Sequence, residues 1–274
     1  MKIARYATNA GPAFGSLNED GAVYAISGDI FGEFDVGARV ADVDDLELLA
    51  PIDPPKLIGV GGNYLAHLEE GGDDAFVPQF PMVFQLPSTS LIGPGDPIVI
   101  PDKAGFAHAV NNRDLQDEPF RPVDYESELV AVIGKPCHRI SPDAALDYVL
   151  GYSCGNDVSA RPLQLAEMAT GVLMLGKGLE TFKPLGPVIA TDLDPTNLRL
   201  RGRHNGVVTQ DTNTSDLLFS VASLVTYLAQ AIRLEPGDCI YTGTPSGGGS
   251  LEPGDTIEVD IDGIGVLSNP VVAG

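Results

Sequence analysis

Apolar and polar positions change over in short blocks along the chain, a pattern that is typical of many short strands. Lys2–Tyr6 and Ala22–Ile26 have strand character, and residues 18–21, with the sequence NEDG, predict the turn between them. Few blocks are long enough for a helix. The overall pattern therefore favours a β-rich α/β fold, built as a roll or barrel.

A cluster of prolines at 51–55 interrupts this pattern. Proline restricts the backbone and cannot donate a hydrogen bond to a strand ladder, so the cluster predicts a linker. We therefore expect a small N-terminal domain over residues 1–55 and a larger domain over residues 56–274.

Three segments of the larger domain predict helices. Asn63 is a suitable cap for a short helix that includes His67 and Glu70. Residues 141–151 begin with Ser-Pro-Asp and end with glycine, which predicts a second helix. Ser220 to Ile232 is the clearest case, because its apolar residues recur at helical spacing.

One predicted strand carries carboxylates where apolar residues are expected. Glu126 and Glu128 are two positions apart, directly before the apolar run Leu129–Ile133, so both project from one face. The run is apolar on both faces, which indicates a buried strand. Buried carboxylates are costly unless a positive charge compensates them, and a hard divalent cation prefers oxygen ligands. The alternative is an edge strand whose glutamates face solvent.

The composition narrows the classes of partner. The 274 residues include 43% hydrophobic and 20% charged residues, which is ordinary for a globular protein. A formal net charge of −22 argues against nucleic acid or an anionic membrane as a partner. The chain has no apolar run of membrane-spanning length, and residues 1–12 have no apolar signal region. We expect a cytoplasmic protein.

The cysteines also bear on the metal. Cys137, Cys154 and Cys239 are odd in number and widely spaced. They match neither a disulfide framework nor a zinc site, and they fit a reducing compartment. A bound metal is therefore expected to have oxygen ligands.

Seven motifs stand in order along residues 56–274. They read GVGGNYLAHLEE, DYESELVAVIGK, GYSCGNDVSARPLQ, GKGLETFKPLGP, QDTNTSDLLF, PGDCIYTGTPSGGG and PGDTIEVDIDGIGVLSNPV. On these motifs the chain resembles the fumarylacetoacetate hydrolase superfamily. The resemblance implies a mixed β-roll fold with a small N-terminal domain, a homodimer, and a bound divalent metal, most often Mg²⁺, with Mn²⁺ or Ca²⁺ as alternatives.

The resemblance also implies the residues of the metal site. The E-x-E of the strand corresponds to Glu126 and Glu128, and the N-D of GYSCGNDVSAR corresponds to Asp157. All three are implied metal ligands. Taken alone, Asp157 is more often a turn or capping residue.

Four catalytic residues are implied in the same way. The NYxxHxxE motif makes His67 and Glu70 a catalytic pair, the G-K motif gives Lys177, and Gln164 follows Asp157 at the family's spacing. The alternatives are a solvated pair on a helix for His67 and Glu70, and a surface lysine for Lys177.

Substrate contacts are implied for Arg161, Thr181 and Thr244. Arg161 is equally a structural partner for a carboxylate, and Thr244 lies in a glycine-rich turn whose shape is an alternative reason for its presence. The chain departs from the family at Leu86, where a lysine is common, and at Glu180, where aspartate is usual. Leu86 suggests a less anionic substrate end.

Members of the superfamily act on 2-oxo or diketo acids, which they cleave, decarboxylate or isomerise. We expect a divalent-metal-dependent hydrolase that cleaves a carbon–carbon bond of a diketo acid of the acylpyruvate type. In it, Glu70 orients His67, His67 takes a proton from water, and Lys177 and Gln164 stabilise the oxyanion. The alternatives are an oxaloacetate decarboxylase, a 2-oxo-dienoate isomerase, or a 2-oxo acid binding protein without catalysis.

Overall fold

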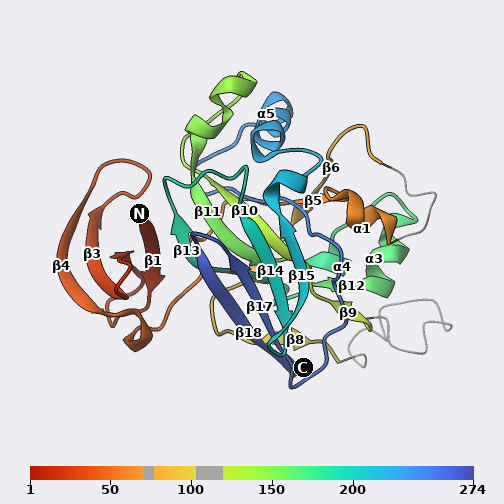
Figure 1. Cartoon of the computed structure of the whole chain (residues 1–274), viewed down its shortest axis with the longest axis horizontal. Helices are drawn as coiled ribbons and strands as arrows, with labels where there is room; N and C mark the ends of the chain where they lie inside the picture. Colours follow the sequence, from red (N-terminus) through yellow and green to blue (C-terminus); the bar gives the residue numbers. More distant parts are fainter. Residues whose placement is uncertain (71–76, 103–119) are drawn as a thin grey trace.

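A large mixed sheet runs across the molecule and carries most of its strands (Figure 1). The computed structural model describes residues 1–70, 77–102 and 120–274. Ten strands of this sheet follow the order β4-β3-β2-β1-β13-β11-β10-β16-β5-β6, and β7 pairs with β13. Their bounds are β1 Lys2–Tyr6, β2 Ala13–Leu17, β3 Ala22–Gly28, β4 Phe34–Asp42, β5 Leu57–Gly61, β6 Met82–Leu86, β7 Leu91–Ile92, β10 Ser127–Ile133, β11 Val149–Asn156, β13 Lys183–Ala190 and β16 Cys239–Tyr241.

A second sheet has the order β15-β14-β17-β18-β8, and β9 and β12 form a short separate pair. Their bounds are β8 Ile98–Ile100, β9 Val123–Asp124, β12 Ser159–Ala160, β14 Arg199–His204, β15 Val207–Asn213, β17 Thr256–Ile261 and β18 Gly265–Ala273. The strands confirm the predicted β-rich, mixed-sheet α/β fold.

The helices of the described residues are few and short. They are α1 Leu65–Glu69, α3 Arg161–Met168, α4 Leu175–Gly178 and α5 Val221–Ala231, with 3₁₀ turns η1 Val43–Asp45, η2 Ser88–Ser90, η3 Pro142–Tyr148 and η4 Thr214–Asp216. The predicted helix at Ser220–Ile232 is confirmed as α5, and Ser220 caps it by accepting a hydrogen bond from the Ser223 amide at 3.2 Å. None of these helices is long and apolar enough to cross a membrane.

Strand β10 lies inside the large sheet and is buried along its whole length. Leu129, Ala131 and Ile133 pack into a core that includes the apolar face of α5. Val130 and Val132 point the other way, into a core with residues of β5, β13 and β16. Both faces are covered, which explains why the run is continuously apolar rather than alternating.

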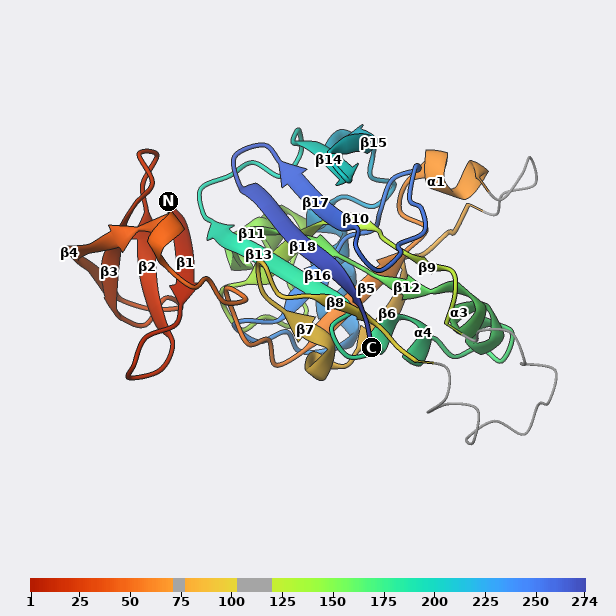
Figure 2. The same ribbon diagram turned by 90° about the horizontal axis from the view of Figure 1, so that it is seen from below.

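The N-terminal strands extend this same sheet. Strand β1 pairs antiparallel with β13, with Lys2 opposite Ala190. Both ribbon views place β1–β4 at one end of the molecule and α1 and α3 at the other (Figure 2). The N-terminal strands therefore lie far from α1 and α3.

Three local predictions were wrong. Residues 141–151 form only the 3₁₀ turn η3 before β11 begins, and Gly151 lies within β11, where a Cβ atom would stand 2.4 Å from the carbonyl oxygen of Ala190. Strand β2 separates β1 from the turn at residues 18–21, so that turn joins β2 to β3. Asn63 does not cap α1: its amide donates to the carbonyls of Phe219 and Thr242.

Candidate active site and metal centre

Three buried carboxylates meet where β10 begins. Glu126 and Glu128 have the same parity along the strand as Val130, so their side chains leave the same face. The third is Asp157, directly after β11, and the exposed fractions are 5%, 1% and 1% in chain order. Oxygens of the three groups, which we call the carboxylate cluster, lie within 4.8 Å of one another. The alternative of solvent-facing edge glutamates is thereby excluded.

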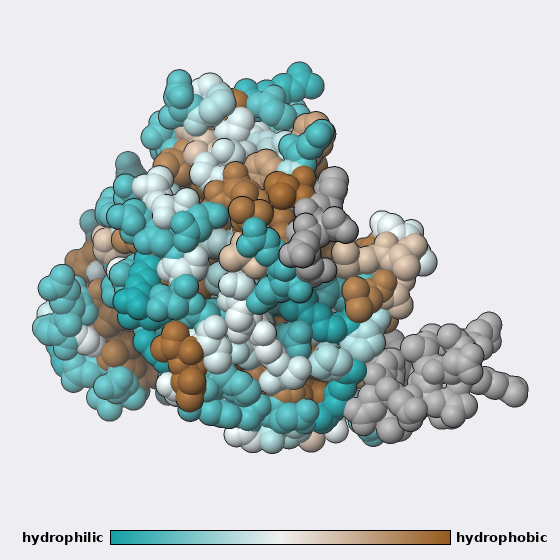
Figure 3. Space-filling model, turned by 45° about the vertical axis from the view of Figure 1, so that its right-hand side comes forward, coloured by the Kyte–Doolittle hydropathy of each residue, from teal (hydrophilic) through white to brown (hydrophobic). Residues whose placement is uncertain are grey.

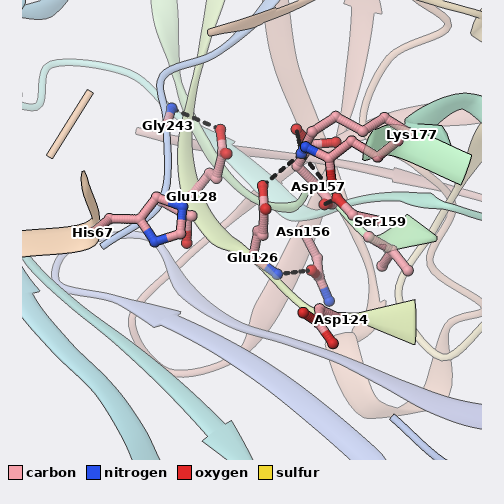
Figure 4. Close-up of polar contacts among 12 residues, drawn as sticks. His67, Asp124, Glu126, Glu128, Asn156, Asp157, Ser159, Lys177 and Gly243 are labelled. Carbon is pink, nitrogen blue, oxygen red and sulfur yellow. Dashed lines mark hydrogen bonds and ion pairs between the residues drawn. The ribbon is translucent and has the colours of Figure 1, made fainter. Parts of the chain in front are cut away.

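The register of two strands explains how Asp157 reaches the glutamates. Strands β10 and β11 are antiparallel with Ser127 opposite Asn156, so the residue after Asn156 falls beside Glu126. The Asp157 amide donates to the Glu126 carbonyl at 2.9 Å, and the Asn156 side chain accepts from the Glu126 amide at 2.9 Å. Figure 4 shows these side chains converging.

Basic side chains approach the cluster from α3, α4 and β13. Lys177 Nζ lies 2.7 Å from Glu126 and 2.8 Å from Asp157, and it also donates to Ser159 Oγ at 2.8 Å (Figure 4). Arg161 lies 2.6 Å from Glu126. Lys183, which is fully buried, lies 2.7 Å from Asp157. Glu126 and Asp157 therefore each have two cationic partners.

Glu128 is held differently. One of its oxygens accepts from the Gly243 amide at 2.8 Å, and none of the ion pairs among the described residues includes it (Figure 4). Burial, and then the charges of Asp157 and Glu126, raise the pKa of Glu128 well above its usual value. Burial also raises the pKa of Glu126, but Lys177 and Arg161 outweigh it and lower that pKa to about 2.

This arrangement fits a divalent cation. Glu128 is a buried carboxyl group without an ion-pair partner in the described part of the chain, and its oxygens lie close to those of two further carboxylates. An all-oxygen donor set suits a hard ion such as Mg²⁺, Mn²⁺ or Ca²⁺. A cation bound by Glu126, Glu128 and Asp157 would supply the missing charge.

His67 and Glu70 form a pair on and just after α1. His67 Nδ1 lies 2.8 Å from Glu70 Oε2, and the other Glu70 oxygen accepts from the Gly247 amide at 2.7 Å. The side chains are 26% and 45% exposed. The backbone contact from the GTPSGGG turn fixes Glu70 from outside its own helix, which distinguishes the pair from two freely solvated residues.

A cavity of about 750 Å³ opens over the carboxylate cluster. The predicted site residues that line it are Glu126, Glu128, His67, Lys177, Gln164, Arg161 and Thr244. No residue of the predicted N-terminal domain 1–55 is among the described residues that line it. The structure thus brings together residues from five of the sequence motifs.

Thr181 is placed elsewhere. Its hydroxyl accepts a hydrogen bond from the Val99 amide at 2.8 Å, and it does not line the cavity. Its φ of 69° lies in the left-handed region, so that hydrogen bond accompanies an unusual backbone conformation just before β13. The contact joins the start of β13 to β8.

Arg161, Gln164 and Thr244 line the cavity but also make structural contacts. Arg161 donates to Asp124 at 2.7 Å and to Gln164 at 2.9 Å. The Thr244 hydroxyl donates to the Ser127 carbonyl at 3.1 Å and accepts from Gln210 at 2.9 Å. Each side chain therefore holds neighbouring parts of the site together.

The sequence analysis missed Asp124, Ser159 and Lys183. Asp124 positions Arg161, Ser159 accepts from Lys177, and Lys183 pairs with Asp157. Burial lowers the pKa of Lys183 to about 8, although the Asp157 carboxylate acts in the opposite direction. The sequence could have indicated Lys183, because it is the one cation in the apolar run KPLGPVIA, which forms a buried strand.

Comparison with known sequences assigns the family. Residues 56–272 match the family described as fumarylacetoacetate (FAA) hydrolase C-terminal. The chain belongs to this family. Residues 1–51 match a second family, described as Rv2993c-like, N-terminal. The matched regions meet near the proline cluster at 51–55.

Individual relatives cover most or all of the chain. Protein Rv2993c of Mycobacterium tuberculosis is 40% identical over 99% of this chain and 98% of its own length. The mitochondrial oxaloacetate tautomerase fahd2 of Xenopus laevis is 37% identical over 86% of this chain and 72% of its length. A Mycobacterium smegmatis crystal structure described as 5-carboxymethyl-2-hydroxymuconate delta-isomerase is 40% identical, with full coverage of both chains and a TM-score of 0.85. Family membership makes this chain an enzyme of small-molecule chemistry.

Proposed function

We propose that this family member is a divalent-metal-dependent hydrolase that cleaves a carbon–carbon bond of an acylpyruvate-type diketo acid. The observation that carries the proposal is that His67, paired with Glu70, lines the same cavity as Glu126 and Glu128 of the carboxylate cluster. Cleavage needs a base for water and a place for the oxygens of a 1,3-dioxo compound. The cavity offers both in one space.

The His67–Glu70 pair is suited to removing a proton from water. An ionised carboxylate only accepts hydrogen bonds. At the 2.8 Å contact, His67 Nδ1 therefore carries the hydrogen atom and donates a hydrogen bond to Glu70. The other ring nitrogen, Nε2, then has a free lone pair. Glu70, anchored by the Gly247 amide, holds the ring in this tautomer and stabilises the imidazolium that forms.

The reaction balances with water as the only co-reactant. The water oxygen bonds to the acyl carbonyl carbon, and the bond from that carbon to the pyruvyl CH₂ breaks. The electron pair goes to the CH₂ carbon, which takes a proton to become the methyl group of pyruvate, and the acyl part leaves as a carboxylate. A divalent cation on the carboxylate cluster would supply Lewis-acid stabilisation of the enolate charge.

Lys177 and Gln164 are proposed to support the developing negative charge. All three Lys177 donors have acceptors, and the Ser159 hydroxyl is the only uncharged one. A substrate oxygen would replace Ser159 at the smallest electrostatic cost. The side-chain oxygen of Gln164 accepts a hydrogen bond from Arg161 at 2.9 Å, so the NH₂ of the same side chain points away from Arg161.

We propose Mg²⁺ as the metal because all three ligands are carboxylates. The decisive experiment supplies Mg²⁺-loaded protein with acetylpyruvate and, separately, with oxaloacetate. We expect acetylpyruvate to yield acetate and pyruvate in equal amounts. Turnover of oxaloacetate alone would refute the hydrolase proposal.

The second candidate is an oxaloacetate tautomerase, which the 37% identity to the Xenopus laevis enzyme favours. The same base, His67, would take a proton from one position of the substrate and return it at another. Tautomerisation changes the ultraviolet absorbance of enol-oxaloacetate without releasing pyruvate. Following both signals in one sample separates this candidate from a hydrolase or a decarboxylase.

A further inference from the structure

The outer part of the cavity is apolar. Six side chains, which we call the apolar wall, line it from α1, β6 and the segment that begins with α3: Leu68, Met82, Val83, Leu165, Met168 and Val172. Met82, Val83, Leu165, Met168 and Val172 are 39% to 65% exposed, whereas the carboxylates beneath are at most 5% exposed. This contrast places the apolar wall at the open end and the charges at the closed end.

Apolar side chains are exposed around this cavity although the chain has a net charge of −22. Figure 3, which brings the side with α1, β6 and α3 forward, shows brown apolar surface on this face amid teal. Concentrated exposed apolar surface commonly marks a binding site.

The basic side chains that line the described cavity already have carboxylate partners. His67 pairs with Glu70, Arg161 with Asp124 and Glu126, and Lys177 with Glu126 and Asp157. Within the described lining, no cation is left for a second carboxylate at the open end. A doubly anionic substrate would there face methionine, leucine and valine side chains.

Phe84 joins the apolar and the charged parts. Its ring lies over Lys177 Nζ, with 5.6 Å from the nitrogen to the ring centroid, and it lines the cavity beside Met82 and Val83. A Cβ atom on Gly59 of β5 would lie 2.2 Å from one carbon of the ring, so the glycine makes room for the ring in this position. A ligand that passes Lys177 would therefore meet an apolar surface at once.

We propose that the substrate's distal end is an uncharged alkyl or aryl group, so that the site selects acylpyruvates with an apolar acyl chain over dicarboxylates of the same length. The inference rests on the proposed hydrolase function for the chemistry of the substrate head. Leu86, where the sequence suggested a less anionic substrate end, is buried in the core and does not line the cavity, so the inference does not rest on it.

The test compares two ligands with the same head. Succinylpyruvate ends in a carboxylate, and 4-methylpentanoylpyruvate replaces that carboxylate with an isopropyl group of similar shape. Calorimetry of the Mg²⁺-loaded His67→Ala protein measures binding without cleavage, and the natural protein measures kcat/KM. We expect 4-methylpentanoylpyruvate to be favoured at least about tenfold in both.

A charge placed in the apolar wall should change the preference. Leu165→Lys adds a cation at a side chain that is 65% exposed. The added ammonium group can pair with the distal carboxylate of succinylpyruvate. The preference for 4-methylpentanoylpyruvate should therefore fall about fivefold, which is the size of effect that an exposed ion pair has. Val207→Lys is the matched control, at 64% exposed on β15 and outside the lining, and it should leave the preference unchanged.

The outcomes separate this inference from the proposed function. If the His67→Ala protein bound succinylpyruvate as tightly as 4-methylpentanoylpyruvate, or more tightly, the inference of an apolar distal end would be overturned, even if the natural protein cleaves both compounds. If neither compound were cleaved, the proposed hydrolase function would be refuted. The binding preference would still decide whether the distal end of the ligand is apolar. If Leu165→Lys instead altered the molar mass by light scattering and left the preference unchanged, the wall would be a subunit interface, and the inference would fail.

Discussion

The carboxylate cluster of Glu126, Glu128 and Asp157, which we call the floor of the site, is at most 5% exposed, whereas the side chains of the His67–Glu70 pair, which we call its rim, are 26% and 45% exposed. The floor residues start from paired strands inside the large sheet. The rim residues lie on and just after α1, a helix of five residues, and Glu70 accepts a hydrogen bond from the Gly247 amide.

Under the proposed function, the difference matches two chemical tasks. Negative charges that hold a cation must stay close together against their own repulsion, which requires strands and buried cations around them. A base that takes a proton from water must remain reachable by water and substrate. The two regions are therefore expected to respond differently when each is changed.

The largest effect is expected from the floor. Glu126→Gln combined with Glu128→Gln removes two of three anionic ligands and should lower Mg²⁺ affinity more than about 100-fold, measured by calorimetry. Asp35→Asn, an exposed acid on β4, is the control and should bind Mg²⁺ normally. Unchanged affinity in the double variant would show that the ligands lie elsewhere.

At the rim, His67→Ala should lower kcat for acetylpyruvate by about 10²- to 10⁴-fold, because the general base is lost. Mg²⁺ affinity should stay unchanged, since the floor is untouched. His138→Ala alters an exposed histidine outside the cavity lining and serves as the control. Full activity in His67→Ala would remove His67 from the mechanism.

Lys183→Met tests how far the floor depends on its buried cations. The change leaves Asp157 with one fewer cation and the carbonyls of Val158 and Phe182 without their donor. The free energy of unfolding of the metal-free protein should fall by about 3 kcal/mol, measured in urea. Lys135→Met, at an exposed position, should change it little. A fall of the same size in both variants would contradict a special role for Lys183.

The smallest expected effect is a pH dependence that distinguishes the two glutamates. In the metal-free protein the pKa of Glu128 is raised, so its contribution to stability is complete below the unfolded value of about 4.3 and is lost as the pH rises through the folded value. Glu128→Gln should therefore flatten the fall of the urea midpoint above that pH.

Glu126 should behave in the opposite way. Its pKa is lowered to about 2, so its contribution is present above pH 4.3 and is lost as the pH falls toward 2. Glu126→Gln should instead reduce the fall of the urea midpoint as the pH is lowered from about 4.3 toward 2. If both variants changed the urea midpoint on the same side of a pH of about 4.3, the charge arrangement described for the floor would be incorrect.

Predictions made from local spacing agree with the structure. Glu126 and Glu128 share a face because side chains alternate along any strand, and Ser220–Ile232 contains α5 because its apolar residues recur at helical spacing. The family motifs likewise identify the mixed-sheet fold and seven residues that line the cavity: His67, Glu126, Glu128, Arg161, Gln164, Lys177 and Thr244. Thr181, which the motifs also indicate, lies outside the cavity lining, and its role stays a prediction.

The failures concern residues whose partners are distant in the chain. Asn63 is a good cap by type, yet its side chain bonds to Phe219 and Thr242, more than 150 residues away. Gly151 resembles a helix end, but it is there because β13 comes too close for a Cβ atom. A local pattern carries no information about such neighbours.

The amino-acid sequence by itself determined the carboxylate pair, the acidic net charge, the family and the all-oxygen donor set of the candidate metal site. Only the tertiary structure decided that Lys183 supports Asp157, that the N-terminal strands extend the main sheet, and that an apolar wall surrounds the cavity. The physical reason is that charge and strand alternation are properties of neighbouring residues, whereas burial and pairing depend on which distant segments the sheets bring together.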